Sequence, residues 1–186
     1  AGTKDNREEF ASVTIDYKKA DTEALNSLMH DGKKNLAIVV GDQDAVVNGE
    51  NRIPAYEEFI RANNLGEPHI YTGIKDYSDG YNLYPQLVKD GIDGVIVTRD
   101  ISSVGILNSA MDAGTKVPEE FEIVTASATQ LASVVRPALT TIKQPLYDIG
   151  AVAMRMLTKL MNNEEVDDTH IELPYELVKK QSTLNQ

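Results

Sequence analysis

The strongest constraint on the fold is a run of five apolar residues, Leu36–Val40, that contains no polar alternation. A strand of this composition is covered on both faces, which is typical of a parallel sheet buried between helices. Helix-type residues follow it, and two more short apolar runs, 95–97 and 121–124, each come after a further helix-type segment. This alternation predicts a doubly wound α/β sheet with right-handed connections.

The remaining elements follow from hydrophobic period and from turn residues. Strands are expected at 12–16, 36–40, 69–71, 95–97, 121–124 and 139–142, and helices at 20–28, 53–62, 83–89, 104–113 and 146–161. Pro145 stands where the last and longest helix can begin. Pro174 has no amide hydrogen to donate, so the segment 171–178 is expected to form at most an edge strand.

The composition is that of an ordinary globular protein, and it excludes several classes of function. A length of 186 residues supports one substantial core, and a net charge of −11 is very acidic for a nucleic-acid-binding surface. Cysteine is absent, which excludes a disulfide framework and a thiolate zinc site. No apolar stretch approaches the ~20 residues that a membrane-spanning helix needs, so we expect a soluble protein. Because it starts at Ala1 without Met, the chain is interpreted as a fragment.

The sequence contains no common catalytic or nucleotide-binding motif. The patterns G-x-G-x-x-G, G-x-x-x-x-G-K-[ST], G-x-S-x-G and H-E-x-x-H do not occur. We therefore expect a protein that is not an enzyme and that holds no cofactor or metal. His30, His69 and His170 lie far apart in the sequence, where a solvated or capping role is more common than metal ligation.

Two other groups of residues leave alternatives open. Asp42 and Asp44 follow the Leu36–Val40 strand, at the end where open α/β sheets bind ligands. They could hold a cation or sugar hydroxyls, or lie in a solvated loop. Four tyrosines could stack on a sugar, although packing against the protein is the better interpretation. These tyrosines are Tyr71, Tyr77, Tyr81 and Tyr84.

The helix expected at 146–161 carries two separate stripes of residues. The apolar stripe is formed by Ile149, Ala153, Met156 and Leu160. The second stripe is formed by Asp148, Val152, Arg155 and Lys159. An Arg fork beside a Lys suits a phosphate dianion. The same charges are favoured by the helix macrodipole, so a solvated face is the alternative interpretation.

The residues around this helix resemble one bacterial protein family. Residues 135–159 read VRPALTTIKQPLYDIGAVAMRMLTK and are similar to the corresponding stretch of LacI/GalR repressors. Other stretches also match the family pattern, including 12–16 before a helix, Asp100 after a strand and 114–119 before the next strand. The resemblance covers essentially the whole chain.

The resemblance implies a two-lobed, periplasmic-binding-protein-like core of parallel sheets flanked by helices. On this basis, residues 35–142 and 166–186 are expected to form a C-terminal lobe. Residues 1–34 and 143–165 are expected to form part of an N-terminal lobe. The family contacts its DNA operator through a helix-turn-helix headpiece, which this sequence does not contain. Homodimerisation is also implied.

A branch of this family that controls carbon catabolism uses the phosphocarrier protein HPr, phosphorylated on a serine, as its co-repressor. The matched helix is its docking site in that branch. The residues that match this docking motif are Tyr147, Asp148, Val152, Arg155 and Lys159. The resemblance implies phosphate and acidic contacts for Arg155 and Lys159 and an apolar contact for Val152. It implies that Tyr147 and Asp148 orient the partner, whereas Glu176 departs from the basic residue usual at its position.

The effector cleft departs further from the family pattern. Where the family usually has Gly-Phe-Asp-Asn, this chain has 125–128 as Thr-Ala-Ser-Ala, so Ser127 replaces the carboxylate that grips sugar hydroxyls. Arg99 replaces a common Asn, and Arg52 is expected to face the same cleft. The prediction is a preference for an anionic ligand such as a sugar phosphate. The alternative is a sugar-responsive repressor core or a periplasmic-type sugar-binding protein.

Overall fold

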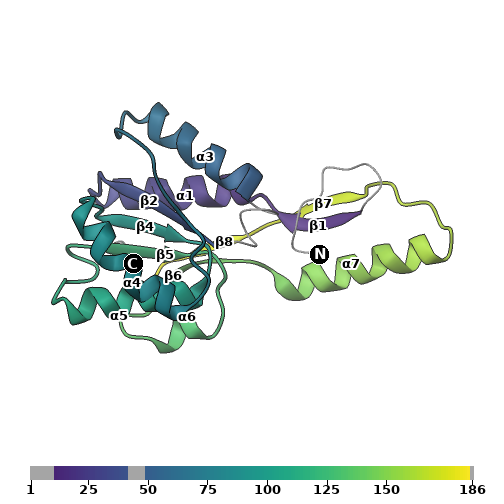
Figure 1. Cartoon of the computed structure of the whole chain (residues 1–186). Coiled ribbons are helices and arrows are strands. Elements are labelled where there is room, and N and C mark those ends of the chain that lie inside the picture. Colours follow the sequence, from purple (N-terminus) through teal and green to yellow (C-terminus); the bar gives the residue numbers. More distant parts are fainter. Residues whose placement is uncertain (1–10, 42–48, 185–186) are drawn as a thin grey trace.

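The computed structural model describes residues 11–41 and 49–184, so Asp42 and Asp44 lie outside the described residues (Figure 1). The strands are β1 (Ser12–Ile15), β2 (Leu36–Val40), β3 (His69–Thr72), β4 (Gly94–Val97), β5 (Glu122–Thr125), β6 (Thr140–Lys143), β7 (His170–Leu173) and β8 (Glu176–Val178). The helices are α1 (Tyr17–His30), α3 (Gly49–Ala62), α4 (Tyr77–Lys89), α5 (Asp100–Asp112), α6 (Leu131–Val134) and α7 (Leu146–Met161).

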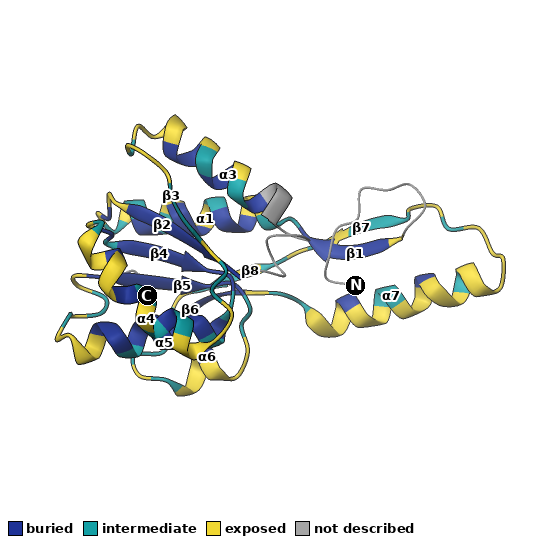
Figure 2. Cartoon of the chain, viewed as in Figure 1, coloured by how far each residue is buried: buried dark blue, intermediate teal, exposed yellow. Residues whose placement is uncertain are grey.

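A six-stranded sheet forms the main body, in the order β3-β2-β4-β5-β6-β8. All its pairs are parallel except β6 with β8. The apolar run of β2 divides between two cores: Leu36, Ile38 and Val40 pack in the cluster that includes α1 and α3. Ala37 and Val39 pack in the cluster that includes α4 and α5. The predicted doubly wound α/β architecture is therefore confirmed (Figure 2).

The segment 171–178 is not one edge strand, as expected, but two strands in different sheets. β7 pairs in parallel with β1 in a separate two-stranded sheet. β8 pairs antiparallel with β6 at the edge of the large sheet. Pro174 lies between them, and since it lacks an amide hydrogen it marks the point where the chain leaves one sheet for the other.

The lobe boundaries also differ from those expected from the resemblance. Residues 1–34 were assigned to the N-terminal lobe, but α1 packs on α3 and the large sheet. Leu25 and Leu28 of α1 are buried in the same cluster as β2. Residues 166–186 were assigned to the C-terminal lobe, but β7 pairs with β1. The chain therefore passes between the two sheets at the connections β1–α1, β6–α7 and β7–β8 (Figure 1).

The structure differs from the sequence prediction in the starts of α4 and α5 and in the presence of α6. α4 was expected to start at residue 83 but begins at Tyr77, because the Asp76 side chain accepts a hydrogen bond from the Asp79 amide and caps it. α5 begins at Asp100 rather than at residue 104. The short α6 was not predicted, because four residues carry no recognisable period.

Two glycines allow α4 and α5 to pack closely. A Cβ on Gly80 would lie 2.2 Å from the Ser102 carbonyl oxygen, and a Cβ on Gly105 would lie 2.2 Å from the Tyr77 carbonyl oxygen. Both obstacles are backbone atoms, so a side chain swing cannot relieve the clash. Side chains at either position would push the two helices apart.

Gly105→Ala is expected to lower the free energy of unfolding by about 2–3 kcal/mol, the upper range for overpacking a core. Gly150→Ala is the matched control, because a Cβ there meets nothing within 4 Å and alanine is the better helix former. Urea denaturation measures both variants. Equal stability of Gly105→Ala and the unaltered chain would contradict the close helix contact.

A buried ion pair joins α1 to α3. Arg52 Nε and Nη2 donate to the two Asp21 carboxylate oxygens, each at 2.7 Å. The Arg52 guanidinium also lies over the Tyr17 ring, 5.1 Å from its centroid. The side chains of Arg52 and Asp21 are only 3% and 1% exposed. This pair therefore anchors α1 to the large body of the protein.

Asp21→Asn should lower the free energy of unfolding by about 3–5 kcal/mol, because the buried Arg52 guanidinium then loses the charge of its bidentate carboxylate. The double variant Asp21→Leu with Arg52→Met should recover most of that loss, since both buried charges of this pair are then removed. Thermal and urea denaturation of both proteins give the comparison. A single variant that is as stable as the starting protein would show that the pair does not anchor α1.

Candidate functional site

The helix α7 lies beside β1 and β7, away from the six-stranded sheet (Figure 1). Ile149 and Met156, which the sequence assigned to the apolar stripe, are buried in the core. The rest of the helix is mostly exposed, as Figure 2 shows. Its exposed apolar side chains are Leu146, Tyr147, Met154, Leu157, Leu160 and Met161. One face of α7 therefore holds the helix in place and the others are available for contact.

The second stripe of α7 presents its cations to solvent. Arg155 is exposed, and Lys159 and Val152 are half-buried on the same side of the helix. Within the described ranges, no carboxylate lies within 4.0 Å of the Arg155 guanidinium or the Lys159 ammonium group. Asp148 is exposed in the first turn, and Tyr147 beside it is 87% exposed. We call these five residues the α7 dock.

Part of the α7 dock lines a pocket of about 230 Å³. Its walls are Val152, Arg155, Met156, Lys159, Val166, Asp167, Asp168 and Ile171. Asp167 and Asp168 were not predicted as site residues. Two adjacent acids shortly before a strand were the signal that could have indicated them. Asp168 Oδ1 accepts a hydrogen bond from the His170 amide at 2.8 Å. The pocket therefore combines two cations with two acids, and the acids weaken the positive potential there.

Glu176, the departure noted at the edge of the docking motif, pairs with a residue of the large sheet. Its Oε2 atom lies 3.5 Å from Lys143 Nζ, and both side chains are exposed. Lys143 ends β6, three residues before α7 begins. The acid therefore compensates a cation close to the start of α7.

Two of the three effector-cleft residues lie together at the carboxyl ends of β4 and β5. Ser127 Oγ donates a hydrogen bond to the Thr98 carbonyl oxygen at 2.8 Å. Arg99 follows Thr98 directly, is half-buried and precedes the first turn of α5. This edge of a parallel sheet is where ligands bind in open α/β folds.

Arg52, which was expected to face the same cleft, has its charge compensated by Asp21. Its guanidinium is buried, and its two donors to Asp21 form a bidentate pair. Asp21 precedes Arg52 by 31 residues, and the sequence pattern did not indicate that they meet. The cleft therefore keeps one of the two predicted guanidinium groups, that of Arg99.

The buried carboxylate of Asp100 shapes the same edge. In the sequence, this residue was noted only as part of the family pattern. Asp100 is 3% exposed and accepts hydrogen bonds from Thr125 Oγ1 and from the Thr129 amide. Ala128 between them has a positive φ of 53°. Asp100 therefore fixes the loop after β5 in a backbone conformation that is uncommon for alanine.

The tyrosines make contacts within the protein. The rings of Tyr77 and Tyr81 stack with centroids 6.0 Å apart, and the Tyr84 ring packs edge-on against Phe121. Tyr71 Oη donates to Asp90 Oδ2 at 2.6 Å. Burial, followed by this hydrogen bond, raises the pKa of Tyr71. These contacts correspond to the packing interpretation.

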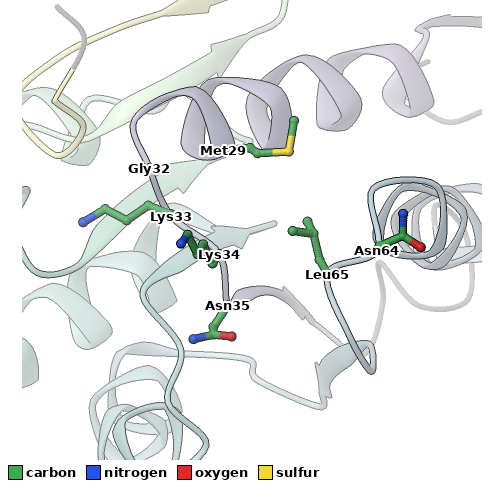
Figure 3. A pocket seen from close by; sticks show the side chains of 7 residues that line it. All are labelled: Met29, Gly32, Lys33, Lys34, Asn35, Asn64 and Leu65. Atoms are coloured by element: carbon green, nitrogen blue, oxygen red, sulfur yellow. The ribbon is translucent and has the colours of Figure 1, made fainter.

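A larger pocket, of about 390 Å³, lies at the start of β2, at the opposite end of the strand from the carboxyl edge. Its lining residues are Met29, Gly32, Lys33, Lys34, Asn35, Asn64 and Leu65 (Figure 3). Lys33 Nζ donates to the carbonyl oxygens of Pro118 and Glu119, at 3.2 and 2.9 Å. Its charge is thus already engaged within the protein.

Within residues 11–41 and 49–184, no group of three or more His, Cys, Asp or Glu residues is arranged to hold a metal ion. None of the helices in those ranges combines the length and apolar character needed to cross a bilayer.

Comparison with known proteins was made for the whole chain. Residues 25–183 match the family model described as periplasmic binding protein-like domain. The HTH-type transcriptional regulator pepR1 of Lactobacillus delbrueckii subsp. lactis is 69% identical over 186 residues, which are 100% of this chain and 56% of that protein. The chain thus spans about half the length of this curated relative.

Solved structures agree with the sequence match. The transcription regulator CcpA of Lactococcus lactis gives a TM-score of 0.91 at 36% identity, covering 98% of this chain and 68% of that chain. The LacI family regulator CCPA from Weissella paramesenteroides, solved with bound glucose, gives 0.80 at 27% identity, covering 98% and 67%. The chain belongs to the periplasmic binding protein-like domain family, in the form found in the core of LacI-family transcriptional regulators similar to CcpA.

Proposed function

We propose that this chain is the core of a regulator of carbon catabolite control that binds seryl-phosphorylated HPr through the α7 dock. The regulator would act as a cytoplasmic homodimer and bind its DNA operator through a headpiece that is not among the described residues. Binding of the phosphoprotein would bias the arrangement of the two lobes, which meet at the three connections described above. The likeness to CcpA supports this proposal at the level of the family.

One observation carries the proposal: Arg155 is exposed and has no carboxylate within salt-bridge distance among the described residues. A planar guanidinium can hold two phosphate oxygens at once, which an ammonium group cannot. Lys159, one helical turn later, adds a second cation on the same side. The helix macrodipole alone would also favour cations near this end of α7. It does not explain why the apolar Val152 lies beside them.

The acids of the pocket refine the proposal. Asp167 and Asp168 share the pocket with Arg155 and Lys159 and would repel a phosphate dianion that approached from their side. A phosphoserine is therefore expected to reach Arg155 from the exposed side of α7. Basic side chains of the same partner would be favoured next to Asp167 and Asp168.

Arg155→Lys should weaken binding of seryl-phosphorylated HPr roughly tenfold, because one of the two parallel hydrogen bonds to phosphate is lost. Isothermal titration calorimetry measures the dissociation constant for the phosphorylated and the unphosphorylated partner. The unaltered chain should bind the phosphorylated form more tightly. Circular dichroism should show that the fold of the variant is intact, since the side chain is exposed.

Two controls separate recognition from general charge effects. Arg61→Lys makes the same exchange at the end of α3 and should leave binding unchanged. Asp167→Asn removes a repulsive charge from the pocket and should strengthen binding about twofold, a typical size for a solvent-screened charge. Unchanged affinity of Arg155→Lys, or equal binding of both forms of HPr, would refute the assignment.

A second candidate function is sensing of a small ligand at the carboxyl edge of the large sheet. The glucose bound to the Weissella paramesenteroides regulator favours it at the level of the family. In this chain Arg99 and Ser127 occupy that edge, and Arg52 is engaged by Asp21. With one guanidinium group remaining, a sugar phosphate is still expected to bind better than the neutral sugar.

Calorimetry with glucose and glucose 6-phosphate tests this preference. The phosphate should bind more tightly, and Arg99→Asn should lower its affinity roughly tenfold, the effect of losing a charge-assisted contact, while leaving glucose unaffected. Ser127→Ala is the matched control, because its hydroxyl already donates to Thr98. If glucose binds as well as its phosphate, the anionic preference is wrong.

A further inference from the structure

A buried pair of carboxyl groups lies at the start of β5, far from the α7 dock in the chain. Glu122, the first residue of the strand, is 0% exposed. Asp31 is the C-cap residue of α1; its side chain is 1% exposed, and its charge is close enough to raise the pKa of Glu122. Glu122 Oε2 is buried and receives no hydrogen bond from a donor in the described part of the chain.

The other oxygen of Glu122 holds the segment Ser182–Leu184. Glu122 Oε1 accepts a hydrogen bond from the Leu184 amide at 3.1 Å. The Ser182 hydroxyl donates to the Ile123 carbonyl oxygen, and the Ile123 amide donates to the Ser182 carbonyl oxygen at 3.1 Å. Ser182 and Thr183 are both 0% exposed. The segment therefore lies against the end of β5 as an extension of the core.

Two neighbouring carboxyl groups in a buried site are costly to ionise together, so Glu122 keeps its proton to a higher pH than a solvated glutamate does. A protonated Glu122 can donate through Oε2 to the Asp31 carboxylate, which satisfies the otherwise unpartnered oxygen. Lys33 is the nearest cation on the α1–β2 turn, but its ammonium group donates to the carbonyls of Pro118 and Glu119. A proton on Glu122 therefore removes one of the two negative charges of the pair.

Two other titratable groups near the pair are His30 and Asp93. His30 is exposed, and its Nδ1 atom lies 3.7 Å from Asp31 Oδ1. Asp93 precedes β4, and its carboxylate accepts hydrogen bonds from the amides of Lys34 and Asn35. Burial is the largest cause that raises the pKa of Glu122 to about 7, and Asp31 raises it further while the Leu184 amide and Lys33 lower it.

We propose that Glu122 and Asp31 form a proton-sharing latch that holds Ser182–Leu184 against β5 and that weakens when the shared proton is lost. The latch closes one end of the large sheet, because the same segment also bonds β6: the Thr140 amide donates to Ser182 Oγ at 2.8 Å. Its loss would free the ends of two strands. The latch is independent of the partner that binds α7.

The direction of the pH effect follows from the proton balance. When the segment opens and Glu122 is hydrated, its pKa returns towards 4.5, whereas in the closed state its pKa is about 7. Between these values the closed state binds more protons than the open state. Closure is therefore strongest below pH 4.5, weakens as the pH rises to about 7, and is constant above that.

Amide hydrogen exchange at Leu184 and Ser182, followed by NMR, measures the opening of the latch. After correction for the intrinsic exchange rate, the opening constant should rise about twentyfold between pH 5.5 and 7.5. Glu122→Gln should abolish this rise, because the amide can accept from Leu184 and donate to Asp31 at every pH. Amides in the middle of β2 report global unfolding and should not show the step.

Two further variants identify the group that titrates. His30→Gln should keep the step, because the histidine is exposed and outside the pair. Asp31→Asn removes the neighbouring negative charge, so the step should become smaller and move to lower pH, and this variant replaces Glu122→Gln if the latter does not fold. A flat profile in the unaltered chain, a step that persists in Glu122→Gln, or a step that disappears in His30→Gln would overturn the latch.

Discussion

Burial of β2 on both faces is the constraint on which the rest of the structure depends. Its side chains pack in two separate cores, so helices must cover both sides of the sheet. Parallel neighbours of β2 then need crossover connections, which place all the loops between strands and following helices at one edge. The position of Arg99, Asp100 and Ser127 at that edge is a consequence of this arrangement.

The helix α7 is in a different physical situation. It has a single buried face, on Ile149 and Met156, and it belongs with β1 and β7 rather than with the six-stranded sheet. A helix that is buried on one side only leaves room for a cationic stripe that forms no salt bridge within the described part of the chain. The sheet edge and the α7 dock are thus separated in space, and the three connections between the sheets join them.

Local patterns in the sequence predicted the elements whose signal is also local. The unbroken apolar run of β2, the proline before α7 and the period of α7 are of this kind. Contacts between distant residues were not predictable in the same way. The pairing of Arg52 with Asp21 and the division of 171–178 between two sheets depend on partners far away in the chain. The start of α4 was missed because Gly80, which looks like a loop residue, is needed for contact with α5.

The most direct test of the account is a map of hydrogen exchange in this chain with and without seryl-phosphorylated HPr. Docking of the phosphoserine on α7 predicts slower exchange in α7 and in the following residues 162–169 with the phosphorylated partner, and little change with the unphosphorylated one. Protection limited to the sheet edge at 98–100 and 125–129, or equal protection by both forms of the partner, would contradict it.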